Sequence, residues 1–136
     1  MSQPRAGSST ILVVSGDAQI RETATELLEL GGHRVLTAAT GEQGLGMALT
    51  VLPDLVLVDH DLPGMNSLEI VERLKAGVAP RKIPVAVLTS GPAEDANGLT
   101  QAGCIASIPK PLEQFDLLHR IARILSVTPG NDRRGS

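Results

Sequence analysis

Aromatic residues and cysteine are scarce in this 136-residue chain. It has no Trp or Tyr and a single Phe, so it lacks the aromatic side chains on which nucleic-acid bases or a flavin ring would stack. The single cysteine, Cys104, excludes an internal disulfide and has no partners for a zinc site. The three histidines, at positions 33, 60 and 119, show no metal-ligand spacing, and we expect them at the surface.

An excess of positive charge and a long apolar run are also missing. Twelve basic residues against fifteen acidic ones give a net charge of −3, without the concentrated basic patch that nucleic acids or anionic membranes attract. No apolar stretch approaches the length of a bilayer-spanning helix. We therefore expect a single cytoplasmic domain that binds neither nucleic acid nor membrane.

Short apolar segments are present, and they alternate with segments of helical spacing. The apolar segments lie at 10–14, 34–38, 55–59, 84–90 and 104–108. Helical spacing runs from Ala18 to Leu30, and Thr40 with Gln43 forms a capping box that opens a second helix. Regular alternation with short connections predicts an α/β fold, in which helices cover both faces of a parallel sheet.

The two ends of the chain and its last helices depart from this regular pattern. Residues 1–9 predict a flexible lead-in and 127–136 a flexible tail, so that the domain spans 10–126. The helix expected at 93–102 carries Asn97-Gly98 in its middle, which weakens it. Spacing in the final helix predicts a buried face made of Phe115, Leu118, Ala122 and Leu125.

Polar residues stand where four of the expected strands end. Ser15-Gly16-Asp17 follows the first strand, Asp59 ends the third, Thr89 and Ser90 end the fourth, and Lys110 closely follows the fifth. Because ligands of such sheets bind at the carboxyl ends of the strands, an acid, a hydroxyl and an ammonium group should converge there. A carboxylate oxygen can attack a phosphoryl group, while the other two groups hold its oxygens. The pattern predicts a site for phosphoryl chemistry.

These segments resemble the receiver domain of bacterial two-component response regulators over about residues 10–125. The matching stretches are ILVV, GHRVLTAATGEQGL, PDLVLVDHDLPGMNSLEIVERL, IPVAVLTS and AGCIASIPKP. The resemblance implies a flavodoxin-like, doubly wound (βα)5 sandwich whose five parallel strands lie in the order 2-1-3-4-5. It also implies a signalling domain rather than an enzyme.

The resemblance further implies a role for each polar residue at the strand ends. Asp59 matches the phosphoacceptor, which receives a phosphoryl group from a sensor histidine kinase or phosphotransfer protein. Thr89 matches the switch hydroxyl, and Lys110 matches the lysine that pairs with the phosphoryl group and precedes a cis proline. Asp61 matches the position whose backbone carbonyl contacts Mg²⁺. Asp59 is implied to bind the same ion.

The resemblance also implies which face of the domain binds a downstream protein. A downstream protein would bind the face made by the fourth helix, fifth strand and fifth helix. Since no output domain follows Leu125, we expect a stand-alone receiver.

Two of the chain's departures from the family bear on its chemistry and its output. Ser15 and Gly16 replace the two adjacent acids that organise Mg²⁺, and Ser107 replaces an aromatic residue that reports phosphorylation. Since Mg²⁺ prefers carboxylate ligands, we expect weak binding. Asp17, one residue later, has two possible roles, as a metal ligand or as a helix N-cap, and the N-cap is favoured.

The missing acids keep a second function open. The chain could act as a phosphorylation-independent adaptor, a pseudo-receiver that works by protein contacts alone. A flavin- or nucleotide-binding enzyme of the same architecture is a third class, but Ser15-Gly16-Asp17 is too short to form a phosphate-binding loop.

Overall fold

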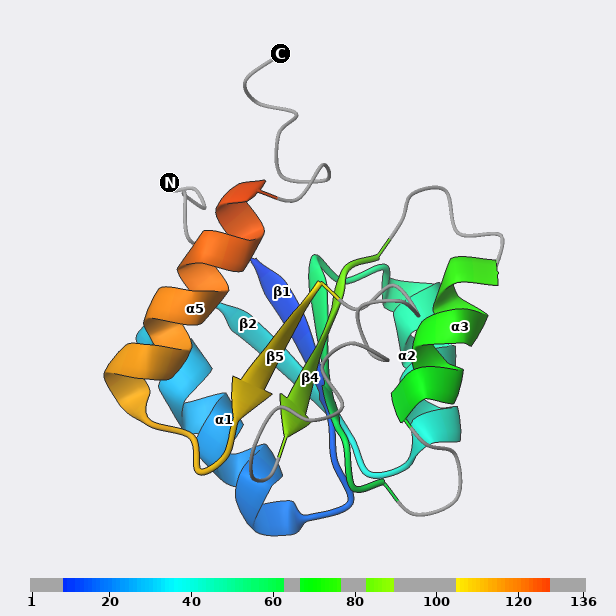
Figure 1. The fold of residues 1–136 in the computed structure, drawn as a ribbon, viewed down its shortest axis with the longest axis horizontal. Coiled ribbons are helices and arrows are strands. Elements are labelled where there is room, and N and C mark those ends of the chain that lie inside the picture. The colour runs from blue at the N-terminus through cyan, green and yellow to red at the C-terminus, as the bar shows by residue number, and fades with distance from the viewer. Residues whose placement is uncertain (1–8, 63–66, 77–82, 90–104, 128–136) are drawn as a thin grey trace.

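The computed structural model describes residues 9–62, 67–76, 83–89 and 105–127, and these form a five-stranded sheet (Figure 1). The strands are β1 (Thr10–Val14), β2 (Arg34–Ala38), β3 (Leu55–Asp59), β4 (Val85–Thr89) and β5 (Ala106–Pro109). All pairs are parallel, and the strand order is β2-β1-β3-β4-β5. The expected flavodoxin-like order is thereby confirmed.

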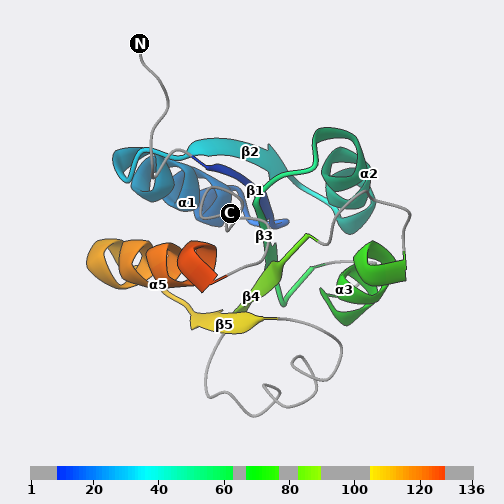
Figure 2. The same cartoon turned by 90° about the horizontal axis from the view of Figure 1, so that it is seen from above.

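Helices cover both faces of this sheet. The helices are α1 (Ala18–Leu30), α2 (Gly41–Val51), α3 (Ser67–Ala76) and α5 (Gln114–Val127). Figure 2 shows α1 and α5 on one face and α2 and α3 on the other, which confirms the doubly wound arrangement. Across the ranges that the structure describes, no helix is both long and apolar enough to cross a membrane. The helix expected at 93–102 and most of the two expected flexible ends lie outside the described residues.

Alternate side chains of the central strands feed two separate cores. In β1, Leu12 and Val14 pack with the residues of α2 and α3, while Ile11 and Val13 pack with those of α1 and α5. The same alternation runs through β3 and β4. Burial on both faces explains why these strands are continuously apolar. The polar residues that end them are therefore conspicuous.

The inward face of α5 differs from the expected one. Phe115 is 77 % exposed and Ala122 is exposed, so the prediction that they are buried was wrong. Leu117, Ile121 and Ile124 instead face the sheet, at spacings of four and three residues. Apolar spacing alone allowed either face, because Leu118 and Leu125 fit both, and the direction in which the helix meets the sheet decided between them.

At the amino-terminal end of the sheet, Asp54 ties β1 to the start of β3. Its carboxylate accepts the backbone N–H of Thr10 at 2.9 Å, and its own N–H donates to the Thr10 carbonyl at 2.8 Å. His33 lies nearby and is half-buried, which corrects the expectation that it is a surface residue. In the described part of the structure its buried Nδ1 has no hydrogen-bond partner.

Candidate functional site

Asp59 lies at the opposite end of β3, where the strand delivers a carboxylate to the carboxyl edge of the sheet. The side chain is 3 % exposed, and the following N–H, that of His60, continues the pairing with Leu88 of β4. Val14 of β1 is in register with Val58 of β3, so the residues that follow them, Ser15 and Asp59, lie side by side. Ser15 thus reaches Asp59, and its hydroxyl donates to Oδ2 at 2.8 Å.

Lys110 occupies the other oxygen of the same carboxylate. Its Nζ lies 2.8 Å from Asp59 Oδ1 and 3.2 Å from Asp61 Oδ2. Burial by itself would lower the pKa of Lys110, but hydrogen bonds and charge attraction to Asp59 and Asp61 outweigh it and raise the pKa. The backbone N–H of Asp61 also donates to Asp59 Oδ1, at 3.0 Å. The site therefore holds a protonated lysine between two carboxylates.

Thr89 joins this group through its backbone. The N–H of Lys110 donates to the Thr89 carbonyl at 2.7 Å, which ties the ends of β4 and β5 together. Thr89 is 9 % exposed, and the Lys110–Pro111 peptide bond is cis, as the resemblance implied. The structure thus brings Asp59, Asp61 and Lys110 into direct contact and places Thr89 beside them.

Asp17 is turned toward its own helix. It is the N-cap residue of α1, and its Oδ1 accepts the N–H of Gln19 at 2.9 Å. This is the favoured one of its two possible roles. Arg21, one turn into α1, donates from Nη1 to the carbonyl of Ser15 at 2.7 Å. A guanidinium group consequently stands at the end of β1, where the family carries its acids.

The donor set at this end of the sheet does not fit Mg²⁺. Magnesium requires near-octahedral oxygen ligands, usually including one or two carboxylates. Both oxygens of Asp59 already accept protein hydrogen bonds, and the carboxylate of Asp61 is paired with Lys110. Ser15 offers only a neutral hydroxyl, and Asp17 caps its helix. Within the described ranges, no three His, Cys, Asp or Glu side chains are placed to hold a metal ion together.

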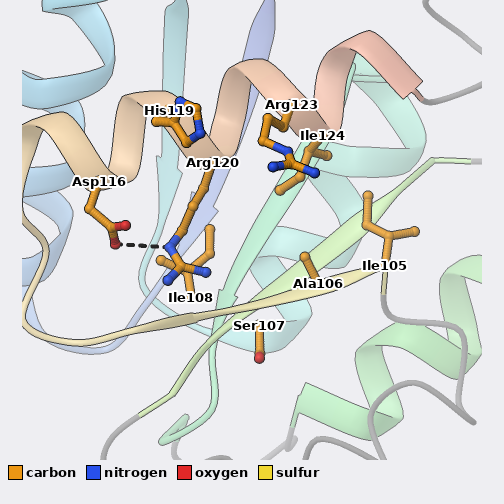
Figure 3. A pocket seen from close by; sticks show the side chains of 9 residues that line it. All are labelled: Ile105, Ala106, Ser107, Ile108, Asp116, His119, Arg120, Arg123 and Ile124. Carbon is orange, nitrogen blue, oxygen red and sulfur yellow. Dashed lines mark hydrogen bonds and ion pairs between the residues drawn. The ribbon is translucent and has the colours of Figure 1, made fainter.

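A groove lies between β5 and α5, on the output face that the resemblance implied (Figure 3). It encloses about 470 Å³. Arg120 donates from Nε to Asp116 Oδ2 at 2.9 Å across one helical turn, and Ile105 is 45 % exposed. The residues that line it are Ile105, Ala106, Ser107, Ile108, Asp116, His119, Arg120, Arg123 and Ile124. Ser107, which replaces the family's aromatic residue, is part of this lining.

Ser15 is the site residue that the sequence reasoning missed. It was predicted to lie at the end of the first strand, in place of an acid, but without a role in the site. Its hydroxyl is fully buried and bound to Asp59. The signal was available only in part. The strand order implied by the resemblance makes β1 and β3 neighbours, but the register that puts Ser15 beside Asp59 is seen only in the structure.

Comparison with known proteins agrees with this fold. The response regulator receiver domain family matches residues 11–122. The phosphate regulon transcriptional regulatory protein PhoB of Pseudomonas aeruginosa is 34 % identical over 125 residues, which are 90 % of this chain and 54 % of PhoB. The chain thus spans about half the length of the first curated relatives that it matches.

Solved structures show the same similarity. A putative response regulator from Chloroflexus aurantiacus superimposes with a TM-score of 0.82 at 28 % identity, over 88 % of this chain and 98 % of that one. The receiver domain of the sensor histidine kinase PA1611 from Pseudomonas aeruginosa, which has a magnesium ion coordinated in its active-site cleft, gives 0.77 at 25 % identity, over 85 % of this chain and 96 % of that one. This chain belongs to the response regulator receiver domain family.

Proposed function

We propose that this chain is a cytoplasmic signalling receiver that accepts a phosphoryl group on Asp59 and passes its state on by protein contacts rather than by turnover of a substrate. One observation carries the proposal: a buried carboxylate at the tip of β3 lies 2.8 Å from the ammonium group of Lys110. Such a carboxylate is a nucleophile whose counter-charge is already in place.

The phosphoryl donor that we propose is a phosphohistidine on a sensor histidine kinase or a phosphotransfer protein. An oxygen of Asp59 forms a bond to phosphorus while the P–N bond to the imidazole breaks. The imidazole nitrogen keeps the electron pair of that bond and takes up a proton, which leaves an aspartyl phosphate and a neutral histidine. No step is assigned to Mg²⁺, because the donors described above do not fit it.

Lys110 and Thr89 would stabilise the transferred group. The raised pKa of Lys110 keeps it protonated, so that its charge offsets the negative charge on the phosphoryl oxygens. Thr89 would turn its hydroxyl toward the same oxygens. Because the Thr89 carbonyl accepts the N–H of Lys110, a shift at the end of β4 would also move the start of the loop that follows β5.

The face formed by β5 and α5 is our proposed contact surface for a downstream protein. It combines the apolar Ile105 with the cationic Arg120 and Arg123 along one groove (Figure 3). Phe115, at the start of the same helix, is the most exposed of the large apolar side chains in the described residues. Apolar anchors next to arginines are typical of protein-binding surfaces.

A second candidate function, the phosphorylation-independent adaptor, is favoured by one observation. Both oxygens of Asp59 are bound by protein donors, so the carboxylate also serves as a structural link between β1, β3 and the loop after β5. In that case Asp59→Asn, which keeps the shape of the side chain, would leave signalling in cells unchanged.

Intact mass spectrometry after incubation with acetyl phosphate, with and without Mg²⁺, tests the leading proposal. We expect a phosphoryl adduct on the unmodified chain and none on Asp59→Asn. Asp54→Asn is the matched control, because it makes the same change at the other end of the same strand and should keep the adduct. An adduct that persists on Asp59→Asn, or no adduct with either acetyl phosphate or a phosphorylated kinase, would refute it.

A further inference from the structure

The Ser15 hydroxyl has a fixed direction in the site. Its oxygen accepts the backbone N–H of Asp17 at 3.1 Å, and it lies 2.8 Å from Asp59 Oδ2. An amide N–H can only donate and an ionised carboxylate can only accept, so the single hydroxyl proton must point at Asp59. Ser15 is completely buried, and the bond is therefore shielded from competing water.

Three protein donors together hold the Asp59 carboxylate. Ser15 binds Oδ2, while Lys110 and the backbone N–H of Asp61 bind Oδ1. These donors come from the end of β1, the loop after β5 and the turn after β3. Hydrogen bonds to a charged group are among the stronger ones in proteins, so a cation that displaced any of these three would first have to offset that loss.

A positive charge next to Ser15 also opposes a cation. Ser15 and Gly16 contribute no carboxylate, and the Arg21 guanidinium lies 2.7 Å from the carbonyl oxygen of Ser15. A divalent ion at this end of β1 would meet a positive group where most receivers present two acids. The end of β1 therefore lacks carboxylate ligands at Ser15 and Gly16, and it gains a positive charge from Arg21.

We propose that Ser15 is a positioning residue that takes the place of a divalent cation at Asp59, so that the carboxylate is held by protein donors alone. The crevice then binds no Mg²⁺ at millimolar concentration, and phosphoryl acceptance does not depend on it. The second statement rests on the proposed function, whereas the first does not.

Paramagnetic Mn²⁺ is the probe for the first statement. In the ¹⁵N-labelled 136-residue chain, Mn²⁺ should produce no selective broadening of the amide signals of Asp59 to Asp61. The variant Ser15→Asp/Gly16→Asp should show selective broadening there, and added Mg²⁺ should reverse it. Gly16 is exposed and is not among the described glycines with positive φ, so an aspartate fits its backbone.

Ser126→Asp is the matched control for the added charge, because Ser126 is exposed on α5. It should behave like the unmodified chain. Selective broadening of residues 59–61 in the unmodified chain, reversed by Mg²⁺, would overturn the proposal.

Two further variants test the positioning role itself. Ser15→Ala removes the donor and Ser15→Thr keeps it, so only the first should shift the ¹³Cγ signal of Asp59. Loss of one hydrogen bond to the carboxylate should also slow adduct formation about tenfold in Ser15→Ala, equally with Mg²⁺ or with a chelator, and Ser15→Thr should restore the rate.

The two proposals can fail separately. If no variant or donor yields an adduct, the proposed function fails, while the Mn²⁺ and ¹³Cγ measurements still decide the role of Ser15. If Ser15→Ala leaves both the Asp59 signal and the rate unchanged, Ser15 does not position the carboxylate.

Discussion

Asp54 and Asp59 flank the same strand, and their surroundings differ in kind. Asp54 precedes β3 and exchanges hydrogen bonds with the backbone of Thr10, at 2.9 Å to its carboxylate and 2.8 Å from its N–H. Asp59 ends the strand and is bound by two side chains, those of Ser15 and Lys110, as well as by one backbone N–H. The carboxylate of Asp54 accepts from a backbone N–H of a strand, whereas two of the donors to Asp59 are side chains, which can rotate.

Under the proposed function, this difference separates a structural carboxylate, Asp54, from a reactive one, Asp59. A backbone N–H in a strand cannot leave its acceptor without disturbing the sheet, so Asp54 is committed to holding β1 and β3 together. A lysine and a serine can rotate toward a new acceptor when one arrives. If Asp59 accepts a phosphoryl group as we propose, substitutions at the two ends of this strand should have separable effects.

The largest expected effect on stability comes from removing the cation at the carboxyl end. Lys110→Met should lower the free energy of unfolding by about 3 kcal/mol, because it leaves the buried Asp59 charge without its partner. Urea denaturation followed by circular dichroism would measure it. The double variant Lys110→Met/Asp59→Asn should recover most of the loss, since no buried charge then remains.

Arg73→Ala is the control for that measurement. Arg73 pairs with Glu69 at 3.2 Å, but both side chains are largely exposed, so their separation should cost under about 1 kcal/mol. If Lys110→Met cost no more than Arg73→Ala, the buried pair would not be the link that the structure indicates.

A smaller effect is expected at the amino-terminal end. Asp54→Ala removes the acceptor for the N–H of Thr10 and should lower the free energy of unfolding by about 1–2 kcal/mol. It should leave the phosphoryl adduct unchanged, as measured by intact mass. A loss of the adduct in a folded Asp54→Ala variant would break the distinction between the two ends.

The smallest effect concerns pH and again lies near Asp54. Burial lowers the pKa of His33. Attraction to Asp54 offsets only part of this change, so the pKa stays below its usual value. His33 therefore binds a proton less readily in the folded chain than in the unfolded chain, where its pKa is about 6.5. Stability is retained above that pH and falls as the pH drops from there toward the folded pKa.

The pH dependence of urea denaturation between neutral and mildly acidic conditions would show this loss. His33→Gln should flatten the curve, whereas His119→Gln, at an exposed position, should leave it unchanged. An unchanged curve in His33→Gln would mean that other groups cause the dependence.

Much of this architecture could be predicted from the sequence, because the features involved are local. Each of the five apolar segments became a strand with ends within two residues of those expected, and Thr40 with Gln43 does cap α2. The proximity of Asp59 and Lys110 could also be predicted, because the carboxyl ends of parallel strands lie at the same edge of a sheet.

Features that depend on packing could not be predicted in the same way. The exposure of Phe115 depends on how α5 meets the sheet, and the burial of His33 depends on the approach of the chain near Asp54. The bond from Ser15 to Asp59 needs the β1–β3 register, which no local pattern contains. Only the structure shows that the Ser15 hydroxyl points at Asp59.

Locating the phosphoryl group on the chain tests the central claim most directly. Borohydride reduces an aspartyl phosphate to homoserine, and peptide mass spectrometry then identifies the converted position. After incubation with a phosphoryl donor, we predict homoserine at position 59 and unaltered aspartate at positions 54 and 61. Homoserine at position 54 or 61, with position 59 unaltered, would contradict the account.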